Sequence, residues 1–345
     1  MISMNTLLVG LLVAMSATFA PAQGCEPIRF TTPRLGAEGE LYQQAHEWRL
    51  TVGLRRLTAD EWFVDSEIRN DLSLMGRAPE VNIHTLLVDV AYGVTSRSRV
   101  RVALPISRGK LTRLWADSAQ HTQSASGLGD LSVLADVWLF EPRSHATGNI
   151  ALGLGVKVPT GKYDTPSRFY RATSSVAFPA DQSIQLGDGG WGIILQGDAF
   201  KRITERASVY GAGSYLANPR GHTDVESQPG SKVYLAVPDI YSLRAGGAYD
   251  LWRDQGVSGS LGVRVDGLPV HDLLGGGGRA YRRPGYALLA EPGLAVSRGR
   301  NTYTLSVPVR LHANRLKSEL ERSTGAINGG DFAKYLVFAG YSHRF

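Results

Sequence analysis

Apolar and polar residues alternate with a period of two along most of the chain. In the segment 98–106 one face is apolar, with Val100, Val102, Leu104 and Ile106. The segment 150–158 repeats the pattern with Ile150, Leu152, Leu154, Val156 and Val158. Successive side chains of a strand point to opposite faces, so this period predicts strands with one apolar and one mixed face.

The same pattern predicts twelve strands, most of them 9 to 14 residues long. They are expected at 46–56, 81–94, 98–106, 128–140, 149–159, 191–200, 207–216, 240–250, 256–266, 285–297, 302–311 and 332–345. A tilted strand needs about 9 to 11 residues to cross the apolar core of a bilayer. The predicted lengths therefore suit transmembrane strands.

The connections between these strands are alternately short and long. Short turns are expected at 95–97, 141–146, 201–205, 251–255 and 298–301. Long loops are expected at 57–80, 107–127, 160–190, 217–239, 267–284 and 312–331. Short periplasmic turns and long extracellular loops are typical of bacterial outer-membrane barrels. We therefore predict an all-β fold, a transmembrane antiparallel up-and-down β-barrel.

Aromatic residues provide a test of this orientation, because Tyr and Trp collect where the apolar band of a barrel meets water. At the loop-side strand ends the expected girdle residues are Trp191, Tyr215, Tyr241, Tyr286 and Tyr335. At the turn side they are Tyr92, Tyr249, Tyr303 and Tyr341. A secreted β-sandwich also alternates, but it has no reason to place aromatic residues at both rims of its apolar face. In the mature chain no run approaches eighteen apolar residues, which excludes a helical membrane protein.

The N-terminus resembles a secretory signal peptide. Residues 6–20 form an apolar run too short to span a bilayer as a helix, and Ala20-Pro21-Ala22 supplies small residues before an expected cut after Ala22. Residues 1–22 are thus predicted to be a signal peptide, 23–45 a periplasmic N-terminal segment and 46–345 the barrel. Met1 to Asn5 lacks the usual basic residue. Cys25 leaves lipidation open as an alternative to an incidental thiol, and a single cysteine excludes an internal disulfide.

The last residue, Phe345, is expected to act as an assembly signal. It ends a strand in which Tyr335, Val337, Ala339 and Tyr341 share its face. A terminal outward aromatic residue resembles the signal that the barrel-assembly machinery recognises. Partners expected for the chain are this machinery, outer-membrane lipid and a small-molecule solute.

The chain offers little that indicates enzymatic chemistry. It lacks HExxH, CxxC and GxSxG motifs, so no catalytic residue, metal ligand or cofactor is predicted. Its net charge of +6 is scattered rather than clustered, which argues against nucleic-acid binding. Gln185 to Gly190 is interpreted as a tight turn, because a single Asp188 is a poor calcium ligand set. A phospholipase-like barrel would need a Ser beside His84 on the outward face near the loop-side rim.

The face opposite the apolar one is predicted to line the lumen. It carries six acidic and six basic residues: Asp89, Arg99, Arg101, Asp130, Asp136, Lys157, Asp198, Arg244, Arg264, Asp266, Glu291 and Arg310. Charges inside a barrel must be paired or hydrated. Hairpin geometry suggests the pairs Asp89 with Arg101, Asp136 with Lys157, and Glu291 with Arg310.

Small inward residues are expected to leave space inside the barrel: Ala103, Gly153, Gly155, Gly246, Gly262 and Gly293. A wet lumen would be a channel, a dry lumen with spanning pairs would be a plug, and satisfied ion pairs could also simply stiffen the wall.

Several stretches resemble a family of outer-membrane transporters grouped with the meta-pathway of phenol degradation, in a less characterised branch. The most recognisable pair of motifs is Gly127-Leu128-Gly129-Asp130-Leu131 and the run from Leu152 to Gly161. Trp48 to Glu67, Arg282 to Tyr286 and Glu291 to Leu294 also resemble the family. The resemblance implies a barrel in the outer membrane of a Gram-negative cell and no particular catalytic residue or substrate.

These observations together predict a passive, porin-like outer-membrane channel or transporter for small solutes, apolar or aromatic ones among them. The alternatives are a closed structural or surface-binding barrel and, with less support, a phospholipase-like enzyme.

Overall fold

The computed structural model describes residues 42–75, 77–276, 278–326 and 329–345. The predicted signal peptide, Cys25 and most of the predicted periplasmic segment lie outside the described residues. Among the described residues, no helix has the length and apolarity to cross a membrane.

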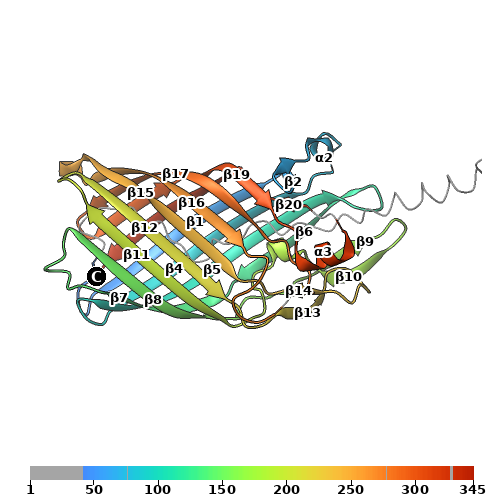
Figure 1. Ribbon diagram of the computed structural model, residues 1–345, viewed down its shortest axis with the longest axis horizontal. Helices are drawn as coiled ribbons and strands as arrows, with labels where there is room; N and C mark the ends of the chain where they lie inside the picture. Colours follow the sequence, from blue (N-terminus) through green and yellow to red (C-terminus); the bar gives the residue numbers. More distant parts are fainter. Residues whose placement is uncertain (1–41, 76, 277, 327–328) are drawn as a thin grey trace, which may run out of the picture.

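The strands of the barrel wall are β1 (Trp48–Ala59), β4 (Glu80–Gly93), β5 (Ser98–Leu114), β6 (Gln120–Leu128), β7 (Leu131–Trp138), β8 (Gly148–Val158), β11 (Gly192–Arg202), β12 (Ala207–Ala217), β15 (Ile240–Trp252), β16 (Val257–Leu268), β17 (Gly285–Arg298), β18 (Asn301–Ser306), β19 (Val309–Arg315) and β21 (Tyr335–Arg344). They occupy twelve positions around the wall in the described part of the chain, because β6 with β7 and β18 with β19 are each one interrupted strand. All pairings are antiparallel between sequence neighbours, and β1 pairs with β21 to close the sheet. The predicted all-β, up-and-down barrel is confirmed (Figure 1).

Both interruptions have local causes. Between β6 and β7 the pairing partner on β5 is Pro105, which has no amide hydrogen to donate, and its carbonyl oxygen accepts from the amide of Gly129 at 2.8 Å. Between β18 and β19 lies Pro308, which has no amide hydrogen and so cannot continue the ladder. The neighbouring strand β17 pairs with β18 from Gly293 onward and with β19 up to Ala290, and its register against β19 shifts between Leu288 and Leu289.

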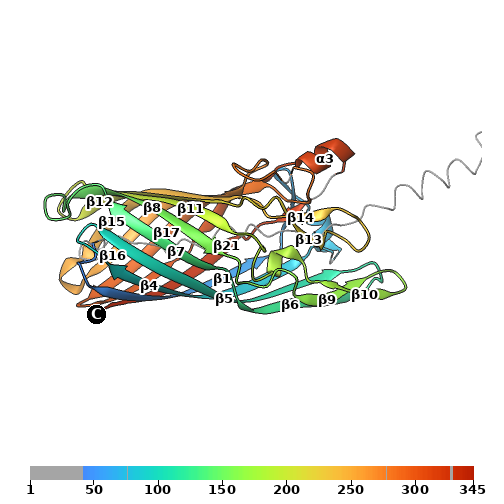
Figure 2. The ribbon, with the colours of Figure 1, turned by 90° about the horizontal axis from the view of Figure 1, so that it is seen from below.

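The two ends of the barrel differ as predicted. Short turns lie at the end that carries the C-terminus, and the long connections gather at the opposite end (Figures 1 and 2). The long connections are not structureless. They contain β2 (Trp62–Val64), β3 (Glu67–Ile68), α2 (Asn70–Leu74), β9 (Pro166–Tyr170), β10 (Ser175–Pro179), η2 (Gln182–Ile184), β13 (His222–Glu226), β14 (Tyr234–Ala236), α3 (Glu319–Thr324) and β20 (Gly330–Asp331). A single turn of 3-10 helix, η3 (Arg253–Gln255), lies at the short-turn end.

The loop expected at 107–127 was wrong in large part. Strand β5 continues to Leu114 and pairs with β6 from Ile106 opposite Leu128 to Leu114 opposite Gln120. The result is a hairpin that projects beyond the rest of the wall (Figure 2). Its residues alternate polar side chains with few apolar ones, so the apolar period ends while the backbone pairing continues.

The outward face of the barrel is apolar and uncovered. Leu54, Leu154, Leu243 and Leu261 expose between 57% and 65% of their surface. A folded water-soluble protein rarely leaves so extended an apolar surface open, whereas lipid requires it. The alternating inward positions are buried instead, which gives the wall one lipid-facing side and one interior side.

Candidate functional site: the barrel interior and its closure

Charged side chains gather inside the barrel on the strands β4, β5 and β7. Arg101 lies 3.0 Å from a carboxylate oxygen of Asp136 and 3.7 Å from one of Asp89, and Arg99 lies 3.0 Å from Asp136. All four side chains are less than 10% exposed. The amide oxygen of Gln196 accepts a hydrogen bond from Arg101 at 2.9 Å, and its amide nitrogen donates to Asp198 at 2.7 Å.

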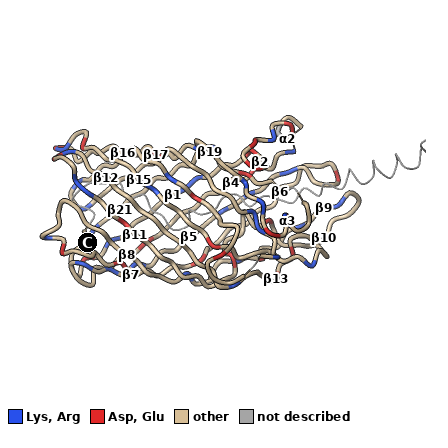
Figure 3. Tube along the Cα trace, viewed as in Figure 1, with Lys and Arg blue, Asp and Glu red and all other residues tan. Residues whose placement is uncertain are grey.

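A second charged group lies on β15, β16 and β17. Arg264 donates to Asp266 at 2.7 Å and to Glu291 at 3.4 Å, and Arg244 lies 3.9 Å from the same carboxylate of Glu291. Ser242 donates to Asp266 at 2.7 Å. Within each of the two groups the positive and negative charges therefore largely cancel. Figure 3 shows charged positions along the strands as well as at both ends of the barrel.

The pairings expected from the sequence were right in one case of three. Asp89 does contact Arg101. The expected pair Asp136 with Lys157 was wrong, because the register places Lys157 opposite Ser132 and Asp136 opposite Gly153, four residues apart along the strands. The expected pair Glu291 with Arg310 was also wrong. Arg310 turns to Glu61 in the first long loop, a partner that strand pattern alone could not indicate.

Neighbouring side chains fill the space beside the inward glycines. A Cβ on Gly246 or on Gly262 would lie 2.7 Å from the hydroxyl of Tyr210, and one on Gly153 would lie 2.6 Å from Asp136. The expectation that these glycines leave open volume was therefore wrong at these positions. A glycine on a sheet face accepts whichever large side chain its cross-strand neighbour supplies.

The loop-side half of the interior holds both apolar and charged side chains, and Arg113, Arg283 and Asp331 are among the charged residues buried there. A buried cluster there includes Leu57 of β1, Ile83 of β4 and Leu289 of β17. Two further members come from the long loops rather than from the wall, namely Ile184 of η2 and Phe332 next to β20. Phe332 packs edge-on against Phe63 of β2 with ring centroids 5.3 Å apart. The loop side is thus closed by side chains that the loops insert.

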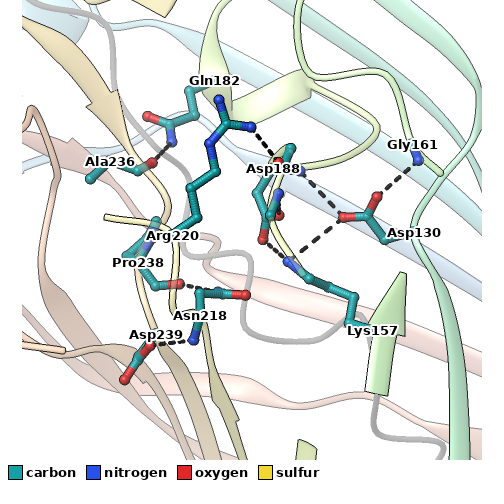
Figure 4. Close-up of polar contacts among 12 residues, drawn as sticks. Asp130, Lys157, Gly161, Gln182, Asp188, Asn218, Arg220, Ala236, Pro238 and Asp239 are labelled. Atoms are coloured by element: carbon teal, nitrogen blue, oxygen red, sulfur yellow. Dashed lines mark hydrogen bonds and ion pairs between the residues drawn. The ribbon is translucent and has the colours of Figure 1, made fainter. Parts of the chain in front are cut away.

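Lys157, near the loop-side end of β8, holds this closing loop (Figure 4). Its Nζ atom contacts Asp188 and lies 3.9 Å from Asp130, and its side chain is 1% exposed. Asp130 in turn accepts a hydrogen bond from the amide of Gly161 at 2.9 Å and one from the amide of Asp188 at 3.3 Å. Both ends of the loop 160–190 are therefore bound to the same pair of wall residues.

Hydrogen bonds to the next long connection extend this network (Figure 4). Gln182 donates to the carbonyl oxygen of Ala236 at 2.8 Å, and Arg220 donates to that of Gly189 at 2.5 Å. Asp239 accepts from the amide of Asn218 at 2.7 Å. Burial raises the pKa of the Asp239 carboxyl, and the hydrogen bonds that it accepts oppose that shift. The closing loop is thereby attached to the wall and to the loop 217–239.

The turn-side mouth is occupied by the first described residues. The ring of Tyr42 packs edge-on against Trp138 at 4.9 Å and against Phe200 at 5.9 Å, both on the inward face of the wall. Its hydroxyl donates to the carbonyl oxygen of His145 at 2.7 Å. Gln43 donates to the carbonyl oxygen of Ala91 at 3.1 Å. Tyr42 and Gln43, within the segment 23–45 that was expected to be periplasmic, thus lie in the turn-side mouth of the barrel.

Most of the aromatic residues expected at the rims lie at strand ends. Trp191, Tyr249, Tyr303 and Tyr335 are exposed, and Tyr92, Tyr215, Tyr241, Tyr286 and Tyr341 are partly buried. Tyr303 and Tyr341 stand opposite each other with ring centroids 5.2 Å apart. Tyr92 packs against Trp48, which sequence reasoning did not include. Phe345 is 63% exposed, and its amide donates to Trp48 at 2.9 Å.

The arrangement offers no support for hydrolytic chemistry at His84. Its cross-strand neighbours are Arg56 and Arg108, so no serine stands directly opposite it on either side. No group of three His, Cys, Asp or Glu side chains suited to a metal ion occurs among the residues that the structure describes.

The outer wall also has a hollow of about 470 Å³ across β11, β12 and β15. Small outward residues create it, among them Gly197, Ala199, Gly211 and Gly213. Most of its lining residues are on the outward face, and Asp198 and Arg244 of the interior groups also contribute to the lining.

Comparison with known proteins relates the chain to solved barrels. No protein-family model matches the sequence, and no curated protein matches it either. An outer-membrane channel from Pseudomonas putida F1 shares the fold with a TM-score of 0.62 and 15% identity, over 91% of this chain and 100% of that one. The toluene transporter TbuX of Ralstonia pickettii aligns with a TM-score of 0.43 and 9% identity, over 94% and 99%. The β domain of the Bordetella autotransporter BrkA aligns with a TM-score of 0.46 and 10% identity, over 88% and 100%. The first likeness is one of fold, which agrees with the architecture that the family resemblance implies.

Proposed function

We propose that the chain is a passive outer-membrane channel for small solutes, apolar or aromatic ones among them, and that the structure represents its closed state. The observation that carries this proposal is the origin of the obstruction. On the loop side, the residues that fill the barrel belong to loops, above all Ile184 and Phe332. These loops can withdraw while the backbone hydrogen bonds between the wall strands stay intact; the contacts of Lys157 and Asp130 with the loop 160–190 would break.

The chemistry of the interior supports apolar solutes. Withdrawal of Ile184 and Phe332 would leave a space walled by Leu57, Ile83 and Leu289. Binding sites for small organic molecules are typically apolar with few polar groups. Below this space a solute would meet the paired charges of Arg101 and Glu291 with their partners, where a fixed net field is small.

The remaining features of the proposal concern assembly and location. Residues 1–22 would act as a cleaved signal peptide, the barrel would lie in the outer membrane, and Phe345 would be read by the assembly machinery. The long loops would face outward. The solved channel of Pseudomonas putida F1, whose name places it in the outer membrane, supports this location through its similar fold.

A closed structural barrel is the second candidate, and the buried ion pairs favour it. Arg264 is fully buried and held by two carboxylates, an arrangement that stiffens a wall whether or not solute passes. The third candidate, a phospholipase-like enzyme, would need a serine beside His84, and the residues directly opposite His84 on both sides are arginines.

Solute flux into liposomes distinguishes the first two candidates. Purified protein is reconstituted into liposomes that contain an enzyme which consumes a small aromatic acid or alcohol, and the rate of consumption is compared with that in protein-free liposomes. A channel predicts protein-dependent uptake of the aromatic solute, with slower uptake of a charged sugar phosphate of similar size. Uptake equal to that of protein-free liposomes for every solute would favour the structural barrel.

A further inference from the structure

Three basic side chains form a row on the outward face of the barrel near its loop-side rim. Arg56 of β1 stands directly opposite His84 of β4, and His84 stands directly opposite Arg108 of β5. All three are exposed. Side chains directly opposite each other on antiparallel strands have Cβ atoms about 4.5 to 5.5 Å apart. The row is therefore a continuous basic surface across three strands.

This row lies just above the apolar band. The next outward row toward the turns consists of Leu54, Leu86 and Ile106, again directly opposite one another. Two residues along a strand span about 7 Å. The basic row thus sits at the level where lipid headgroups replace acyl chains. At this rim the strands β11, β12, β15, β17 and β21 carry Trp or Tyr instead.

No acidic side chain compensates the row. Within the described part of the chain, no ion pair joins Arg56, His84 or Arg108 to a carboxylate. Their outer cross-strand neighbours are Val337 beside Arg56 and Ser126 beside Arg108.

The following row toward the loops adds a further cation. Thr58, Asn82 and Lys110 stand opposite one another there, and Lys110 is exposed. The nearest acid on this face of β4 is Glu80, four residues beyond His84, and it accepts a hydrogen bond from Asn82 at 2.7 Å. Cationic side chains placed side by side repel each other, so the arrangement calls for an external anion.

We propose that this row binds the phosphate groups of the glycolipid that fills the outer leaflet of outer membranes, a phosphorylated and multiply acylated disaccharide of the lipid A type. The proposal rests on the outer-membrane location proposed above and goes beyond solute transport. Guanidinium groups bind phosphate through paired hydrogen bonds, which suits Arg56 and Arg108. The acyl chains would lie below along Leu54, Leu86 and Ile106. The basic row thus lies at the height of the lipid's phosphate groups, and the apolar row lies at the height of its acyl chains.

The test measures lipid binding to the purified, detergent-solubilised full-length protein. Diphosphoryl lipid A is titrated, and the bound lipid is followed by native mass spectrometry. We expect R56Q/R108Q to weaken binding by at least about tenfold, because two charge-assisted contacts are lost. The control K201Q/R206Q removes two exposed basic residues at the turn-side rim and should bind lipid A like the wild type. Equal binding by R56Q/R108Q would overturn the proposal.

A charge reversal separates lipid binding from fold stability. H84E places a carboxylate between Arg56 and Arg108, so it should leave the barrel at least as stable as the wild type while abolishing lipid A binding. Undiminished binding by H84E would contradict the proposal.

Two further comparisons identify the ligand and separate this proposal from the channel. Dephosphorylated lipid A should bind as weakly to the wild type as diphosphoryl lipid A binds to R56Q/R108Q. If inorganic phosphate at equal concentration competes fully with lipid A, the row is a simple anion site and the lipid assignment fails. Liposome flux through R56Q/R108Q should match the wild type, so failure of one proposal can be told from failure of the other.

Discussion

The ammonium group of Lys157 on the barrel wall contacts the carboxylate of Asp188 in the loop that closes the barrel. A buried lysine that loses its partners, or a carboxylate that loses its lysine, leaves an uncompensated charge among buried side chains. This contact therefore connects the stability of the wall with the closed position of the loop.

Replacing Lys157 tests that connection. K157L should lower the free energy of unfolding by about 3 to 5 kcal/mol, because it strands Asp130 and Asp188 without their cation. It should also release the loop 160–190, which would become sensitive to added protease. Heat-modifiability on gels reports the first effect and limited proteolysis the second. A change below about 1 kcal/mol, the value of an exposed pair, would mean that the site is open to water.

The lipid-facing side of the wall predicts a different sensitivity. L154R places a charge on an outward position that is 60% exposed on the apolar face. It should lower the free energy of unfolding in a lipid bilayer by about 2 to 4 kcal/mol. The matched variant L154A should have a much smaller effect. Equal stability of L154R and L154A would mean that this face does not contact lipid.

The C-terminal residue should matter for assembly rather than for export. Deleting Phe345 removes an exposed aromatic side chain whose backbone amide also bonds to Trp48 of β1. We expect less folded barrel in the outer membrane and unfolded chain in the periplasm. Cell fractionation followed by heat-modifiability gels measures both, and F345Y is the control that keeps an aromatic end. Normal amounts of folded barrel from the deletion would refute the assignment.

The loop segments that close the loop side of the barrel, including Ile184 and Phe332, form a cap, and this cap should loosen as the pH rises. Asp331 of β20 is fully buried, and this burial raises the pKa of its carboxyl to about 7, although Arg283 opposes the shift. The folded cap then keeps this proton up to about pH 7, whereas an unfolded chain releases it near pH 4. The stability that Asp331 contributes is therefore full below about pH 4 and is lost as the pH rises toward 7.

The variant D331N keeps a neutral group at every pH and should remove this dependence. Limited proteolysis of the cap at pH 5 and pH 8 compares it with the wild type, and D254N in an exposed turn is the control. A wild-type cap that is equally protected at both pH values would contradict the role given to Asp331.

Much of the wall could be predicted because its cause is local. A strand in a lipid-embedded barrel must alternate apolar outward side chains with inward ones. The period of two alone therefore places Leu152 and Leu154 outward and Arg99 and Arg101 inward. Ion-pair partners were harder to predict from the sequence, because they depend on the register between neighbouring strands. Lys157 lies opposite Ser132 and cannot reach Asp136.

The closure of the barrel could not be predicted from the period at all. The turn before Trp191 was recognised as a tight turn, but nothing in its pattern shows that Asp188 returns to the wall. Likewise Ile184 stands between the polar residues Ser183 and Gln185, so no apolar pattern in the sequence points to it. Its burial against Gly109 is decided by contacts far away in the sequence.

The most direct test of the account is whether fixing η2 to the wall keeps the channel shut. A Cβ at Gly109 would lie 2.8 Å from that of Ile184, so the variant G109C/I184C, in a background with Cys25 replaced by serine, can form a disulfide after a shift of about 1 Å. Single-channel currents are recorded in a planar bilayer before and after reduction, with each single-cysteine variant as a control. The account predicts a silent oxidised protein that conducts once it is reduced. Equal conductance in both states, or no conductance from reduced and wild-type protein alike, would contradict a channel gated by this loop.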